Sequence, residues 1–297
     1  MNNTVMLISS MASNLFGSLI KKRINDKYEN NMFSYQIYNA VVSFSAALSL
    51  LILSDDLSVS VYTVVLAVAF GIITFIQQIF NLYALENGPL SYTTVIISLS
   101  TLIPTVSGAL FWNEKIVFVQ YIGIFLLVIS FILSVNLKNK EKNGGIKWLI
   151  FSIITFIATG LIGVMQKIHQ TSQFKDELDS FLIISFAFSF VISSVLAVLF
   201  RRKRSDNKNN CLKSVLNYVP IILMLLSGIF VAINNKFNLY LSGVIDAAVF
   251  FPLVNGGGLI LTSVSAVIFF KEKLSKLKFL GIVSGIVSVI LICNPFA

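Results

Sequence analysis

The sequence is poor in the residues that carry most catalytic chemistry. It contains one histidine, His169, two cysteines, Cys211 and Cys293, and 13 acidic residues among 297. The two cysteines lie far apart, so they offer neither metal-ligand spacing nor a disulfide framework. A membrane enzyme would need clustered histidines or carboxylates, which this composition does not supply. We therefore predict that the chain is not an enzyme and holds no metal or cofactor.

Charge is equally scarce. Charged residues make up 12% of the chain, whereas soluble domains carry about 25%. Hydrophobic residues make up 56%, and the mean hydropathy is +0.87. These values predict a polytopic membrane protein surrounded by lipid. The net charge of +9 lies in short loops between apolar runs, so it indicates membrane orientation, and we expect no nucleic-acid partner.

Ten apolar runs are long enough for transmembrane helices, since a span needs about 20 such residues. The runs lack the alternation of barrel strands, so the sequence predicts an all-α protein. Three basic residues follow the first run and none precedes it, so this run is expected to be a retained helix. The ten runs cover approximately residues 4–20, 33–53, 60–84, 89–112, 116–136, 146–168, 180–200, 215–241, 244–270 and 275–293.

Lysine and arginine divide unevenly between alternate loops. The loops after the first, third, fifth, seventh and ninth runs carry 18 of the 22 basic residues, and the other side carries 4. Basic loops of membrane proteins usually stay in the cytoplasm. The sequence therefore predicts a multi-pass protein of the cell membrane with both termini outside.

An internal repeat determines the expected architecture. Residues 111–133 align without gaps on residues 269–291, with eight of the 23 positions identical, and the tetrapeptide FNLY at 80–83 recurs at 237–240. The chain is thus predicted to contain two five-helix units, residues 1–142 and 143–297. Five is odd, so the second unit is inverted relative to the first. Inverted repeats around a central cavity are a recurrent transporter design.

The layout resembles the drug/metabolite transporter superfamily, specifically its ten-helix, EamA-type bacterial members. The resemblance rests on the Glu114-Lys115 and Glu272-Lys273 turns, which lie in register with the ten spans. It implies a carrier of small organic solutes in the plasma membrane, either a monomer or a homodimer. From their position before a span, we interpret both Glu-Lys pairs as structural: glutamate favours a helix N-terminus and lysine the headgroup level.

Amide side chains inside the spans are the first candidates for a solute site. Gln77 and Asn81 share one helix face, and their repeat partners Asn234 and Asn238 have the same spacing. Four such amides are able to line a cavity and bind a polar solute through hydrogen bonds. The alternative is that they only link neighbouring helices.

Lysines form a second candidate set. Lys167 matches Lys21 in the repeat and has a histidine and a glutamine nearby, so it is a candidate for binding an anionic or carbonyl group of the solute. Lys236 is either a second cation of the cavity or an interfacial anchor. For Lys21, we expect its ammonium to reach the headgroups.

The segment from Pro252 to Gly258 combines a proline, an asparagine and three glycines within an apolar run. It matches a part of the fourth run that includes Ser98 and is followed by Pro104. Weakened spans at corresponding positions of two halves indicate a transporter binding site. The alternative is tight helix crossing without a ligand. We expect Ser98 and Asn255 to line the cavity and five residues to bend or gate the helices: Pro104, Pro252, Gly256, Gly257 and Gly258.

No acidic residue lies deep in a span, and the first run offers Asn14 where proton-coupled relatives carry a carboxylate. We include Asn14 among the cavity residues. Because a proton relay needs an ionisable group inside the membrane, exchange or facilitated diffusion is favoured over proton antiport. The expected solute is a neutral, zwitterionic or anionic metabolite. A flippase for a lipid-linked molecule is the alternative function.

Overall fold

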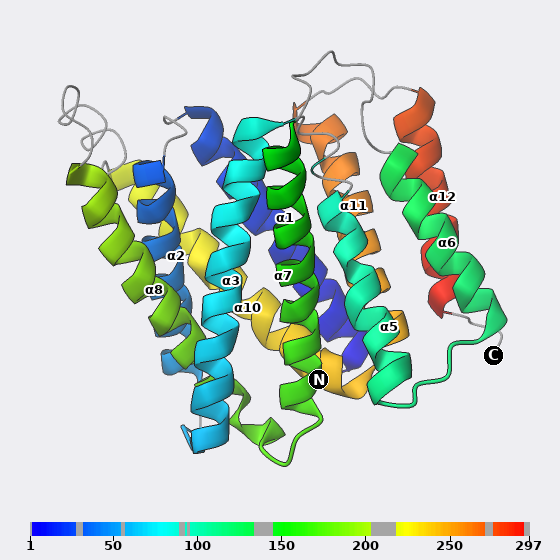
Figure 1. Cartoon of the computed structure of the whole chain (residues 1–297), viewed down its shortest axis with the longest axis horizontal. Coiled ribbons are helices and arrows are strands. Elements are labelled where there is room, and N and C mark those ends of the chain that lie inside the picture. Colours follow the sequence, from blue (N-terminus) through cyan, green and yellow to red (C-terminus); the bar gives the residue numbers. More distant parts are fainter. Residues whose placement is uncertain are drawn as a thin grey trace. The chain divides into compact units, whose positions relative to one another are not determined.

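The computed structural model describes residues 2–27, 32–54, 57–88, 93, 96–133, 145–202, 218–270 and 276–293, and within these ranges every regular element is helical (Figure 1). The second Glu-Lys pair, Glu272-Lys273, and the predicted junction of the two repeats lie outside the described residues. The α-helices of the described part are α1 (Asn3–Lys27), α2 (Met32–Leu53), α3 (Val61–Asn87), α5 (Leu102–Phe111), α6 (Phe118–Leu133), α7 (Ile146–Gln170), α8 (Leu178–Arg202), α10 (Tyr218–Val244), α11 (Ala247–Phe270) and α12 (Lys276–Cys293).

Six apolar helical segments are long enough to cross a membrane: Asn3–Lys21, Phe33–Leu53, Val61–Asn87, Ile146–Gln170, Lys175–Phe200 and Tyr218–Val244. The remaining four predicted runs coincide with shorter apolar stretches, Ile96–Phe111, Phe118–Leu133, Ala247–Gly258 and Phe279–Cys293. The structure therefore supports an all-helical, multi-pass membrane protein. The full count of ten spans stays a prediction.

The chain forms two compact units, and each takes segments from both halves of the sequence. Unit 1 consists of Met1–Ile72 and His169–Tyr240, and unit 2 consists of Ile73–Ile168 and Leu241–Ala297. These spatial units differ from the predicted division into residues 1–142 and 143–297, which describes the repeat along the chain. Helices α3, α7 and α10 each contribute to both units.

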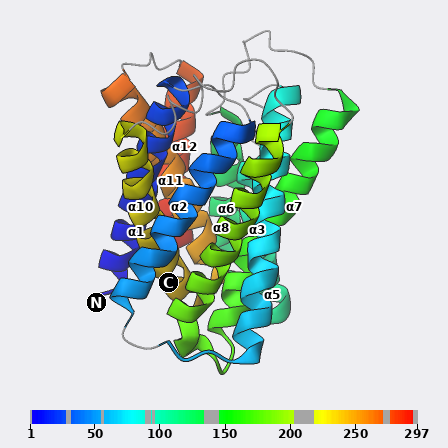
Figure 2. The same cartoon turned by 90° about the vertical axis from the view of Figure 1, so that its left-hand side faces the viewer.

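In unit 1, α2 and α8 lie side by side (Figures 1 and 2). Ser180 at the start of α8 donates a hydrogen bond to the Ser58 carbonyl, beyond the end of α2, at 2.7 Å, so the two helices run in opposite directions. The rings of Phe44 and Phe190 meet with centroids 5.5 Å apart. Each phenylalanine follows a serine, and the two are separated in sequence by the same interval as Gly17 and Gly163.

In unit 2, α6 and α12 form an equivalent antiparallel pair (Figure 1). Ser130 donates to the Gly281 carbonyl at 2.6 Å, and Ser288 donates to the Gly123 carbonyl at 2.7 Å. The alignment of 111–133 on 269–291 matches Gly123 with Gly281 and Ser130 with Ser288. The two hydrogen bonds are thus one contact made in both directions, as in an interface with a two-fold axis.

The proline-containing helices of unit 2 differ from each other. Residues 99–101 form a 3-10 turn directly before α5, at the position where the missing N–H of Pro104 interrupts regular α-helical bonding. In contrast, α11 continues as a helix through Pro252 and the three glycines. A Cβ atom on Gly256 would lie 2.6 Å from Cδ1 of Leu127 on α6, so this glycine permits close helix packing. That contact agrees with the alternative of tight crossing, and gating by these residues stays a prediction.

Candidate polar sites

A cluster of polar side chains joins α1 to α10 within unit 1. The hydroxyl of Ser10 lies 2.6 Å from Oδ1 of Asn238 and 3.0 Å from Oδ1 of Asn234. Nδ2 of Asn238 donates to Oδ1 of Asn234 at 3.3 Å. Ser10 is fully buried, while the two asparagines are half-buried. The predicted i, i+4 pair thus shares one helix face and retains exposed surface.

Neighbouring amides behave differently. Asn14 lies one helical turn after Ser10 on α1 and is exposed. Asn235 donates from Nδ2 to the carbonyl of Val231, one turn back on its own helix, at 2.9 Å. The side chain of Asn235 is therefore bound to the backbone of its own helix.

Lys236 forms an ion pair with Asp179, the second residue of α8. Its ammonium lies 2.8 Å from each carboxylate oxygen, and the two side chains are 34% and 18% exposed. A helix turns about 200° over two residues, so Lys236 projects from the side of α10 opposite to Asn234 and Asn238. The predicted second cation is thus balanced by a carboxylate from a neighbouring helix.

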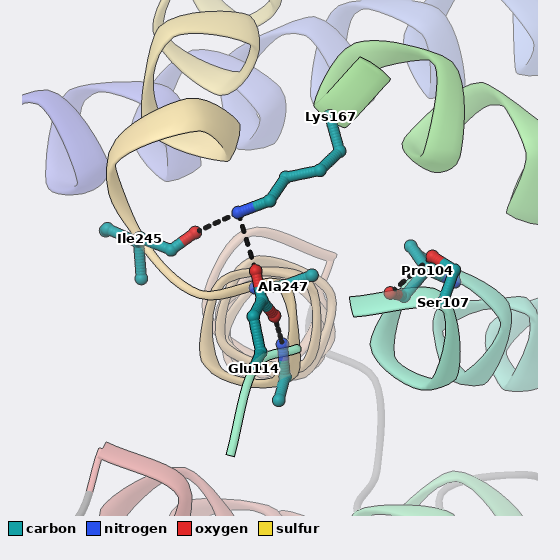
Figure 3. Close-up of polar contacts among 7 residues, drawn as sticks. Pro104, Ser107, Glu114, Lys167, Ile245 and Ala247 are labelled. Atoms are coloured by element: carbon teal, nitrogen blue, oxygen red, sulfur yellow. Dashed lines mark hydrogen bonds and ion pairs between the residues drawn. The ribbon is translucent and has the colours of Figure 1, made fainter. Parts of the chain in front are cut away.

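A second ion pair is almost fully buried in unit 2. Nζ of Lys167 on α7 lies 2.7 Å from Oε1 of Glu114, and each side chain is 6% exposed. Nζ also donates to the carbonyl of Ile245 at 3.2 Å, directly before α11 (Figure 3). The other oxygen of Glu114 accepts from the backbone N–H of Ala247 at 2.7 Å. Negative charge at a helix N-terminus is favourable because the first N–H groups lack helical partners.

This arrangement revises two expectations. The glutamate does bind a helix N-terminus, but that helix is α11 and not α6, which follows it in sequence. The anion and carbonyl expected to meet Lys167 are Glu114 and Ile245 of the protein itself, in place of a solute. Lys21, its repeat partner, instead lies 5.5 Å and 5.9 Å from the ring centroids of Tyr35 and Tyr38.

The other predicted site residues fall into two groups. Gln77, Asn81 and Ser98 are half-buried in unit 2, and Asn255 is exposed on α11.

Sequence reasoning missed Ser10 and Asp179. Serines are common in membrane spans, and Asp179 lies at the edge of a predicted span, so the sequence does not distinguish either residue as a site residue. Within the described residues there is no group of three or more His, Cys, Asp or Glu side chains that could hold a metal ion.

No family model and no curated protein matches the chain. Among solved structures, the chain is similar to one described as "Crystal structure of protein", with a TM-score of 0.76 at 10% sequence identity. The match covers 97% of this chain and 95% of the other. The similarity shows that the two chains share a fold over nearly their whole length, and it carries no information on function.

Proposed function

We propose that the chain is a secondary transporter of a small organic metabolite, built from two inverted five-helix repeats in the plasma membrane. The antiparallel pairs α2–α8 and α6–α12 support this architecture, because matched residues of the two halves contact each other in both. The strongest support for the inverted repeat is the reciprocal pair of hydrogen bonds Ser130–Gly281 and Ser288–Gly123. Such reciprocity is what an inverted repeat requires around its two-fold axis.

The observation that carries the function is the Ser10–Asn234–Asn238 cluster, in which two half-buried asparagines bind a buried serine inside membrane-length helices. Polar groups at such positions are expensive and usually face a water-filled cavity or the interior of a bundle. Their incomplete burial supports solute binding over a purely structural link. Gln77 and Asn81, the repeat partners of the two asparagines, are half-buried in unit 2 and stay predicted cavity residues.

The ion pairs narrow the class of solute. Lys167 and Lys236, the lysines suggested for anion binding, each pair with a carboxylate. The two lysines therefore no longer support an anionic solute, whereas a neutral or zwitterionic solute remains compatible with the site. Asp179 lies at the start of α8, Glu114 lies between α5 and α6, and both are paired with lysines, so exchange or facilitated diffusion is proposed over proton antiport.

The test is counterflow in proteoliposomes. Purified protein should exchange at least one labelled metabolite of a mixed pool with saturable kinetics. Asn238→Ala should lower that exchange about tenfold, since loss of one or two hydrogen bonds in a desolvated site costs about 1–3 kcal/mol. Asn235→Ala is the matched control and should leave exchange unchanged. If the protein exchanges no solute but scrambles a labelled lipid, the flippase function replaces this proposal.

A further inference from the structure

The hydrogen bonds of the Ser10–Asn234–Asn238 cluster have a direction. A serine hydroxyl donates a single hydrogen, and the shorter contact of Ser10 is to Oδ1 of Asn238 at 2.6 Å. Asn238 in turn donates from Nδ2 to Oδ1 of Asn234. The chain of donation therefore runs from Ser10 through Asn238 to Asn234. Both side-chain carbonyl oxygens face the buried serine.

This direction leaves the cluster with donors for a ligand. An asparagine amide nitrogen carries two hydrogens. Asn238 uses one of its two on Asn234, and no hydrogen bond from Nδ2 of Asn234 is found within the described part of the chain. Both N–H groups of Asn234 and one of Asn238 thus remain for a partner. Because both asparagines are half-buried, that partner reaches them from the open side of the cluster.

The local charge is balanced. Lys236 lies between the two asparagines in sequence, but it projects from the opposite side of α10, where its ammonium is bound by Asp179 at 2.8 Å. A carboxylate ligand at the cluster would meet amide dipoles without an uncompensated cation, and an ammonium ligand would meet N–H groups of the same polarity. Burial of a charge without a partner is costly. A neutral oxygen acceptor is the ligand that matches three amide hydrogens without burying an unpaired charge.

We propose that this cluster is a specificity site that selects neutral solutes bearing carbonyl-type acceptor oxygens, such as amides, imides and lactams. This inference rests on the proposed transport function and adds the chemical class of the solute. Asn234 is the central residue, because it holds two of the donors and its own oxygen is already bound. Ser10 is a positioning residue, since its hydroxyl fixes which end of Asn238 faces the solute.

The test reverses the polarity of the site without changing its shape. Asn234→Asp keeps the oxygen that accepts from Asn238 and replaces the donating nitrogen by an anionic oxygen. Asn235→Asp introduces the same charge one residue away, at an amide bound to its own helix, and serves as the matched control. Counterflow is measured with three labelled probe sets: uracil and nicotinamide as neutral carbonyl compounds, choline and putrescine as cations, and succinate and malate as anions.

The expected result is saturable exchange of the neutral probes by the wild type. Asn234→Asp should reduce this exchange at least about tenfold and raise cation exchange relative to it, because a site that hydrogen-bonds its substrate rejects a mismatched one strongly. Asn235→Asp should change neutral exchange by less than about twofold. Ser10→Ala should weaken the preference for neutral probes over cations.

Two results would overturn the inference while leaving transport intact. One is a wild-type preference for the cations or the anions. The other is an equal effect of Asn234→Asp and Asn235→Asp on neutral exchange. Absence of saturable exchange for every probe in the wild type would instead overturn the proposed transport function together with this inference.

Discussion

At the scale of single residues, Glu114 and Lys167 are the most constrained charges of the described chain. Each side chain is 6% exposed, and together they hold the N-terminus of α11 and the preceding Ile245 carbonyl. Removal of one partner from a buried ion pair leaves an uncompensated charge, which typically costs about 3–5 kcal/mol. We therefore predict that Glu114→Gln and Lys167→Met each lower the thermal stability of the detergent-solubilised protein strongly.

A double-mutant cycle isolates the pair. Glu114→Gln combined with Lys167→Met should be more stable than the sum of the two single losses implies, because neither charge is left alone. The matched control is Lys115→Met, since Lys115 is adjacent but exposed and should change stability by less than about 0.5 kcal/mol. Additive single effects would show that the two residues do not act as a pair.

Part of the polar cluster could be predicted from the sequence and part could not. The spacing of Asn234 and Asn238 places them on one helix face, because residues four apart are neighbours on a helix. Ser10 is 224 positions away from Asn234, and helical periodicity says nothing about such distant partners. The pairing of Lys236 with Asp179 was missed for the same reason, since it joins two different helices.

At the scale of helices, close approach of α6 and α12 depends on glycine. A Cβ atom on Gly123 would lie 2.7 Å from Cγ1 of Ile292 and 3.1 Å from the backbone nitrogen of that residue. Backbone cannot move aside as a flexible side chain does, so Gly123→Ala should separate the two helices. We predict a loss of about 1–3 kcal/mol, the usual cost of overpacking, measured by thermal unfolding in detergent.

Gly145 provides the matched control for this substitution. It directly precedes α7, and a Cβ atom there would meet nothing within 4 Å. Gly145→Ala should leave the melting temperature unchanged or raise it slightly by restricting the unfolded chain. Equal melting temperatures for Gly123→Ala and the wild type would refute close glycine-mediated packing of α6 on α12.

The positions of the helices follow from the sequence more closely than their irregularities do. Long apolar runs must be helical in lipid because every backbone polar group needs an internal partner. The described helices begin and end within a few residues of the predicted runs, apart from polar ends such as Lys21–Lys27 and apart from α5, which begins at Leu102 within the predicted run 89–112. The contrast between Pro104 and Pro252 was not predictable. Near the start of α5 the chain adopts a 3-10 turn, whereas α11 remains helical around Pro252.

At the scale of the whole molecule, scarcity of charge makes the few charges informative. Lys167 and Lys236 each pair with a carboxylate from another segment: Glu114, between α5 and α6, and Asp179, at the start of α8. The remaining basic residues lie mostly in alternate loops, where their uneven distribution predicts the orientation of the chain. The lysines that form ion pairs inside the units and the basic residues of the loops are thus two distinct sets.

The loop charges make a prediction about orientation that two cysteines can test. The 18 basic residues on one side place Cys211, which lies outside the described residues, in the cytoplasm and the C-terminal end of α12 outside. Cys293, the last residue of α12, is exposed. In intact cells, a membrane-impermeant maleimide should label the Cys211→Ser variant, which retains Cys293. It should spare the Cys293→Ser variant, which retains Cys211, until the membrane is permeabilised. Labelling of Cys211 before permeabilisation, with Cys293 protected, would reverse the orientation and place both termini in the cytoplasm.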